Sequence, residues 1–214
     1  MKFSTRELVT LTVFGALWGV VEISVGSLAH ILNLPLSGAI LAAAGLMIAL
    51  TGRLFVPRRG STLFIGIIAM ILKLFSIGSV VAGPMIGILA EAAIAELVLT
   101  TFGRPTRHSF VVAGALGVLW ALFQPFVTGI LLFGRDIFVI WLDLLDMGSR
   151  LFGFDTEAVF WIVLVLMILF LLVGGVAGWL AWDVGQLLRT RLDGTSVVPS
   201  DEGEEDMGGD NDGS

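Results

Sequence analysis

The longest apolar run of the chain, residues 158–185, reads AVFWIVLVLMILFLLVGGVAGWLAWDVG and carries one charged residue, Asp183, near its end. A helix needs about 20 apolar residues to cross the roughly 30 Å of hydrocarbon in a bilayer. The run therefore predicts a transmembrane helix. Five similar stretches precede it, at residues 8–28, 37–55, 62–82, 85–102 and 109–133. The sequence thus predicts an all-α integral membrane bundle of six transmembrane helices.

The composition agrees with this class. Hydrophobic residues make up 57% of the 214 residues and charged residues only 14%, whereas soluble domains carry about 25% charged residues. The chain contains no cysteine, which excludes disulfide frameworks, thiolate zinc sites and iron–sulfur ligation. The first apolar run is too long for the core of a secretory signal peptide, so we expect it to remain as a span.

The acidic residues are concentrated at the C-terminal end. The formal net charge is −6, and residues 193–214 contain eight acidic residues and no Lys or Arg. A segment this polar cannot bury a hydrophobic core. We expect residues 1–190 to form the six-helix transmembrane domain and residues 191–214 to form a disordered acidic cytoplasmic tail.

The basic residues predict the orientation of the bundle. Nine of the 12 lie on one side of the predicted spans: Lys2, Arg6, Arg53, Arg58, Arg59, Arg104, Arg107, Arg189 and Arg191. Cytoplasmic loops of membrane proteins carry an excess of Lys and Arg. Both termini are therefore predicted to be cytoplasmic, in agreement with an even number of spans.

The one long external connection, residues 134–157, shows a helical pattern. Asp136, Asp143, Asp146 and Arg150 share one face of a helix, and apolar residues including Ile140 occupy the other. This pattern is typical of an amphipathic helix at the membrane interface. A lid over an outward-facing site is the alternative interpretation.

Four charged residues lie inside predicted spans, namely Glu22, Lys73, Glu91 and Glu96. Charges at this depth are costly, so they mark buried pairs or functional sites. Lys73 and Glu96 both fall near the midplane of adjacent antiparallel spans, which predicts a structural ion pair. A proton or ion relay formed by the same two residues is the alternative.

Three polar residues fall at a second level, nearer the outer boundary. Counting about 1.5 Å per residue places Glu22, Glu91 and Gln124 at similar depth. They could converge on a ligand cavity open to the outside, in which carboxylates favour a cationic or hydrogen-bond-donating ligand. Trp120, one helical turn from Gln124, could stack against such a ligand. Hydrogen bonding between helices and core packing are the alternatives.

The sequence favours no enzyme. Only two histidines are present, and no metalloprotease, serine-hydrolase or phosphate-loop motif occurs. We therefore expect no catalytic residues, no metal site, no cofactor and no nucleic-acid partner.

Two sequence features carry a family resemblance. Span one contains the small-residue pair Gly15-x-x-x-Gly19, and the fourth span opens with GPMIGILAE at residues 83–91. With six glycine-rich spans and no nucleotide motif, the chain resembles the substrate-binding membrane subunits, or S components, of energy-coupling-factor transporters.

The resemblance implies a function in vitamin or micronutrient uptake across the prokaryotic plasma membrane. It implies that a small water-soluble molecule binds near the outer face, and we expect Glu22, Glu91, Gln124 and Trp120 to bind it. It also implies a transmembrane coupling subunit and cytoplasmic ATPases as partners. The coupling subunit is expected to dock through Gly15 and Gly19, or through the adjacent Thr12/Ala16 stripe if Glu22 faces the ligand.

Two other functions remain open from the sequence. A proton-coupled secondary transporter would use Lys73 and Glu96 as its relay. In a non-transporting membrane scaffold protein, every intramembrane charge would be a contact between helices.

Overall fold

The computed structural model describes residues 3–31, 36–75, 82–134, 136–152 and 159–195, and it confirms the all-α fold. Within these ranges the chain forms seven helices and no strand. The helices are α1 (Thr5–Ile31), α2 (Ser37–Phe55), α3 (Ser61–Lys73), α4 (Ala82–Phe102), α5 (Arg107–Phe133), α6 (Ile137–Phe152) and α7 (Val159–Thr195).

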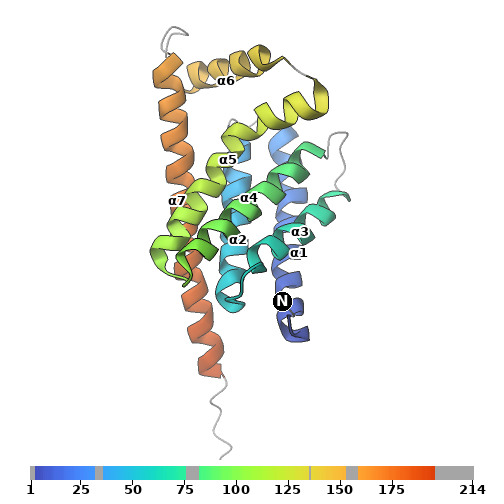
Figure 1. Cartoon of the computed structure of the whole chain (residues 1–214), viewed down its shortest axis with the longest axis vertical. Helices are drawn as coiled ribbons and strands as arrows, with labels where there is room; N and C mark the ends of the chain where they lie inside the picture. Colours follow the sequence, from blue (N-terminus) through green and yellow to red (C-terminus); the bar gives the residue numbers. More distant parts are fainter. Residues whose placement is uncertain (1–2, 32–35, 76–81, 135, 153–158, 196–214) are drawn as a thin grey trace, which may run out of the picture.

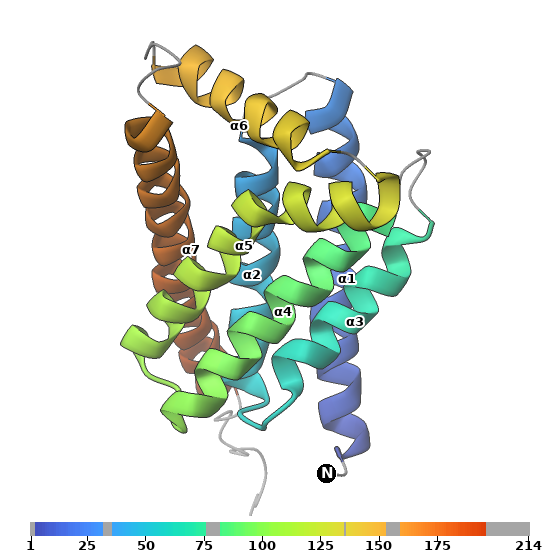
Figure 2. The ribbon, with the colours of Figure 1, turned by 45° about the horizontal axis from the view of Figure 1, so that its top comes forward.

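Six of the helices form a bundle of two layers. Helices α1, α2 and α7 make one layer, and α3, α4 and α5 cross it obliquely to make the other (Figure 2). Each helix of the bundle contacts its neighbours in a closed ring, in the order α1, α3, α4, α5, α7, α2. The arrangement brings helices that are distant in sequence, such as α2 and α7, side by side.

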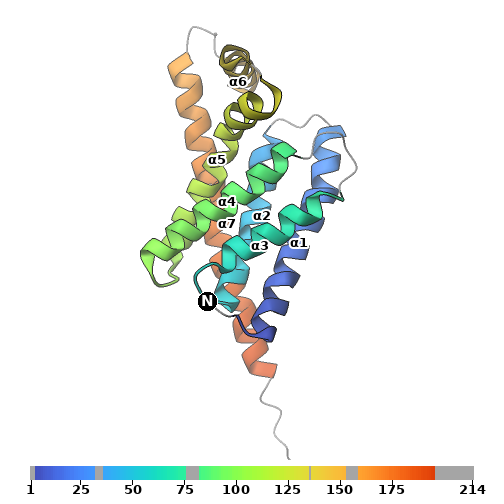
Figure 3. The same ribbon diagram turned by 45° about the vertical axis from the view of Figure 1, so that its right-hand side comes forward.

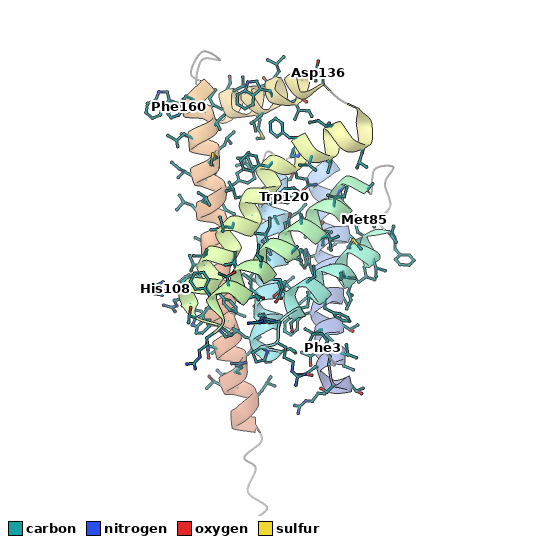
Figure 4. All side chains as sticks on the ribbon, viewed as in Figure 1. Phe3, Met85, His108, Trp120, Asp136 and Phe160 are labelled. Atoms are coloured by element: carbon teal, nitrogen blue, oxygen red, sulfur yellow. The ribbon has the colours of Figure 1, made fainter. Side chains whose placement is uncertain are left out.

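The two ends of the bundle differ in what they carry. Helix α6 lies across one end, which we call the α6 end (Figure 1). Helix α1 begins and α7 finishes at the opposite end, which we call the basal end. Phe3 and His108 lie at the basal end, and Asp136 and Phe160 lie at the α6 end (Figure 4).

Five helices, all except α3 and α6, are long and apolar enough to cross a membrane. Large apolar side chains cover their outer surfaces; Val9, Val13 and Val20 of α1 are each about 60% exposed. Such a surface is unsuited to water and fits a bilayer. The chain is accordingly a multi-pass membrane protein.

The predicted third span is too long. Helix α3 covers only Ser61–Lys73, 13 residues, which corresponds to about 20 Å. After Lys73 the chain tightens into a turn, in which the amides of Leu74 and Phe75 donate to the carbonyl oxygens of Ile71 and Leu72. The rest of the predicted span includes residues 76–81, which lie outside the described residues.

The start of the predicted tail belongs to α7. Helix α7 continues through Thr195, so residues 191–195 are helical. The remainder of the predicted tail, residues 196–214, lies outside the described part of the chain.

Glycines allow α5 and α7 to cross with their backbones in direct contact. A Cβ atom added to Gly174 would lie 2.8 Å from Cα of Ala115, and still nearer to the carbonyl oxygen of Gly114. A Cβ atom on Gly178 would likewise meet the carbonyl oxygen of Phe110. The two backbones therefore touch directly, which is the purpose of small residues four apart in membrane helices.

Helix α6 confirms the predicted amphipathic pattern. Asp136, Asp143 and Asp146 are exposed, whereas Ile140 and Leu145 are 3% and 6% exposed. In the described part of the chain, α6 contacts α5 and α7 (Figure 3). Helix α6 thus covers the ends of α5 and α7, rather than α1 and α3.

Candidate ligand site

A polar cavity lies in the half of the bundle nearer the α6 end. It has a volume of about 180 Å³ and is bounded by five helices. Its polar lining comprises Glu22 of α1, Ser37 of α2, Lys73 of α3, Glu91 of α4 and Gln124 of α5. Its apolar wall includes Leu41, Ala42, Pro84 and Ile88. The cavity is therefore formed where α1 and α3 end and where α2 and α4 begin.

One side of the cavity is an ion pair between α1 and α3. The Lys73 ammonium donates to the backbone carbonyl of Glu22 at 2.9 Å and to its carboxylate Oε2 at 3.3 Å. The two side chains are only 9% and 8% exposed. The pair neutralises both charges and fixes the end of α3 against α1.

Glu91 lies on α4 with its carboxylate incompletely bonded. The residue is 4% exposed, and its Oε2 atom has no hydrogen-bond partner. Buried carboxylates ordinarily accept several hydrogen bonds, since burial without them is costly. Glu91 is thus the acidic group of the cavity that the protein itself leaves unsatisfied.

Gln124 completes the polar lining from α5. Its Nε2 donates to the carbonyl oxygen of Gly83 at 3.1 Å, at the start of α4. A Cβ atom on Gly87 would meet the Gln124 carboxamide, with Cδ at 2.7 Å. The glycine therefore leaves the space in which this amide reaches the cavity. Pro125 follows inside α5, and the helix changes direction over its second half (Figure 2).

The structure thus brings together three of the four residues predicted to bind a ligand, namely Glu22, Glu91 and Gln124. Trp120 lies on α5 at mid-height of the bundle (Figure 4) and does not line the cavity. Its indole nitrogen is buried without a hydrogen-bond partner. Sequence reasoning missed Lys73 as a cavity residue, because the depth assigned to it assumed that its helix continued to residue 82.

The predicted Lys73–Glu96 ion pair is wrong. Glu96 pairs instead with Arg53 of α2, with 3.4 Å between Oε1 and Nη2, while Lys73 pairs with Glu22. Because α3 begins at Ser61 and runs antiparallel to α4, Glu96 meets the start of α3 rather than its end. We call Arg53, Glu96 and the groups that donate to Glu96 the basal cluster.

Glu96 is the acceptor at the centre of the basal cluster. It accepts hydrogen bonds from the backbone amides of Gly60 and Thr62 at 2.7 and 3.0 Å, and from the Thr100 hydroxyl at 2.9 Å. Free amides at a helix N-terminus attract a carboxylate. The sequence therefore contained a signal for this contact: a helix that begins near Gly60–Ser61, and a glutamate on the following span.

The prediction that Gly15 and Gly19 dock a partner subunit is also wrong. A Cβ atom on Gly15 would lie 2.7 Å from Cβ of Ile68, and one on Gly19 would lie 2.8 Å from Cβ of Leu72. Both contacts are to α3 of the same chain. The small-residue face of α1 is therefore used for packing inside the bundle, and the exposed face of α1 is a different one.

No known protein family, curated protein or solved structure matches the chain. Within the described residues, no group of three or more His, Cys, Asp or Glu side chains is placed to hold a metal ion.

Proposed function

We propose that the chain is the substrate-capturing subunit of an energy-coupling-factor type uptake transporter, and that it binds a small water-soluble molecule in the cavity. One observation carries the proposal. Glu22, Lys73, Glu91 and Gln124, from four different helices, converge on one cavity, and Glu91 has an unpartnered buried oxygen. Ionisable residues inside membrane spans are functional-site candidates by default, and a carboxylate with only a structural role would have its hydrogen bonds satisfied by the protein.

The proposed orientation rests on the basic residues. Arg6, Arg58, Arg59 and Arg104 are exposed at the basal end. The excess of basic residues on the cytoplasmic side of membrane proteins favours placing this end in the cytoplasm of a prokaryotic cell. Both termini are then cytoplasmic, α3 acts as a short sixth span, and the cavity lies towards the outer face, where a subunit that captures an external molecule needs it.

Cysteine labelling is expected to report this orientation, since the chain has no cysteine of its own. Arg150 on α6 and Arg104 between α4 and α5 are exposed residues at opposite ends. In intact cells, a membrane-impermeant maleimide is expected to label Arg150→Cys. It should label Arg104→Cys only after the membrane is opened. Labelling of Arg104→Cys in intact cells, with Arg150→Cys protected, would reverse the proposed topology.

The partners are expected to be a transmembrane coupling subunit and cytoplasmic ATPases. The resemblance to S components motivates this expectation, although Gly15 and Gly19 take no part in the docking. Tagged protein purified gently from its native membrane is expected to bring down subunits with ATPase activity. Vesicles containing that complex should accumulate the ligand only when ATP is supplied.

Two results would contradict the proposal of an energy-coupling-factor type subunit. A chain that never associates with ATPases would behave as a scaffold protein. Uptake driven by a pH gradient in the absence of ATP would identify a proton-coupled secondary transporter instead.

A further inference from the structure

The charges around the cavity do not balance. Its ionisable lining residues in the described part of the chain are Glu22, Lys73 and Glu91. Lys73 is committed to Glu22, at 3.3 Å from its carboxylate. With Glu91 ionised, the lining carries one uncompensated negative charge, and a buried charge is stable only when it is paired.

Two of the donors that line the cavity are already engaged. Lys73 donates to two oxygens of Glu22, and the Gln124 amide donates to the carbonyl of Gly83. Oε2 of Glu91 receives a hydrogen bond from neither of them. A bound group that carries a positive charge and an N–H donor at the same point would both balance the charge of Glu91 and satisfy its Oε2 atom.

We propose that the cavity binds a small organic molecule through a protonated amine, which donates an N–H hydrogen bond to Oε2 of Glu91. This inference rests on the proposed function and names the class of its substrate. A charge-assisted N–H···O bond is the strong way to satisfy such a carboxylate. The carbon skeleton of the ligand lies against Leu41, Ala42 and Ile88, which form the apolar wall of the cavity.

A metal ion fits the site less well than an amine. Calcium takes six to eight oxygen ligands, and magnesium takes six, of which one or two are usually carboxylates. Here one of the two carboxylates is bound by an ammonium group, 3.3 Å away. The volume of about 180 Å³ also exceeds what a single ion needs, because about 10–15 Å³ on the same measure holds one water molecule.

Size-matched probes test the proposed class with the full chain in lipid nanodiscs near neutral pH. The probes are n-butylammonium, tetramethylammonium, n-butanol and butyrate, and binding is measured by calorimetry or ligand-detected NMR. We expect saturable binding of n-butylammonium. Tetramethylammonium carries the charge but has no N–H donor. Its affinity, and that of n-butanol and butyrate, should be at least about tenfold lower than that of n-butylammonium.

Two carboxyl-to-amide variants test whether n-butylammonium binds at Glu91. Glu91→Gln is expected to weaken n-butylammonium binding about ten- to a hundredfold, because the charge is lost while the side-chain shape is kept. Glu7→Gln is the matched control, since Glu7 pairs with Arg58 at the basal end, 2.8 Å away. It should bind n-butylammonium like the unaltered chain.

The outcomes separate this inference from the transport proposal. Equal binding of all four probes, no saturable binding of n-butylammonium, or an unchanged affinity in Glu91→Gln would overturn the amine class. If Glu91→Gln fails to fold, the probe series on the unaltered chain decides the question. Copurification of ATPases together with a failed amine test would leave the transport role intact, whereas amine binding without ATPases would leave the ligand class intact.

Discussion

Replacement of Glu96 by alanine is expected to lower the free energy of unfolding by about 3–5 kcal/mol, because it strands the buried Arg53 guanidinium. The Arg53 side chain is 6% exposed, and its Nε and Nη1 atoms already have no hydrogen-bond partner. Among the described residues, Glu96 is the one acidic group that forms an ion pair with Arg53, with 3.4 Å between Oε1 and Nη2. The same substitution also removes the carboxylate that accepts hydrogen bonds from the amides of Gly60 and Thr62. This carboxylate fixes the start of α3.

Unfolding in mixed detergent micelles, followed by helical content, measures this loss. Asp146→Ala is the control, since Asp146 pairs with Arg150 at 2.7 Å on α6, where the two side chains are 57% and 78% exposed. Solvent screens that pair, so its removal should cost about 0.5 kcal/mol or less. If Glu96→Ala were no less stable than Asp146→Ala, the basal cluster would not hold α2, α3 and α4 together.

Replacement of Gly174 by alanine is expected to cost about 1–3 kcal/mol, because the added methyl group has no space at the α5–α7 crossing. A Cβ atom there would lie 2.8 Å from backbone carbon atoms of Gly114 and Ala115. Backbone cannot move aside as a flexible side chain can, so the two helices must separate. Their separation opens the core around Phe110, which is fully buried.

The neighbouring glycine provides a matched control for this substitution. A Cβ atom on Gly175 would lie 3.6 Å from Cγ1 of Val111, an ordinary van der Waals distance. Gly175→Ala should therefore leave stability unchanged or raise it slightly, because alanine favours the helix over glycine. Equal losses in Gly174→Ala and Gly175→Ala would show that helix propensity, rather than close approach, sets the cost.

The helices follow directly from hydrophobic length. The predicted span 37–55 coincides with α2, and the predicted end of the fifth span at residue 133 coincides with the end of α5. The rise per residue along each span also predicted that Glu22, Glu91 and Gln124 lie at similar depth, and the structure places them around one cavity. These features depend only on the rise per residue and on bilayer thickness.

The ion pairs could not be predicted in the same way. Counting depth along 62–82 placed Lys73 at the midplane, but α3 ends at Lys73, so its ammonium lies near the α6 end beside Glu22. Depth also carries no information on which neighbour a side chain faces. Glu96 meets Arg53 of α2 because of the rotation and order of helices in the ring, which are tertiary properties.

The spacing of small residues predicted that a helix would approach another closely, but it did not predict which helix that would be. Gly15 and Gly19 have the spacing of a docking motif, yet the helix they approach is α3 of the same chain. Gly174 and Gly178 have identical spacing and approach α5. The pattern predicts close approach of two helices, and the identity of the second helix is known only from the structure.

Native mass spectrometry of the protein, released gently from its native membrane, tests most directly whether the Glu91 cavity is a ligand site. The unaltered chain and Glu7→Gln are predicted to carry the same additional small molecule, and Glu91→Gln is predicted to have lost it. An unaltered chain without any bound small molecule, or a Glu91→Gln chain that retains the molecule to the same extent, would contradict the proposed role of the cavity.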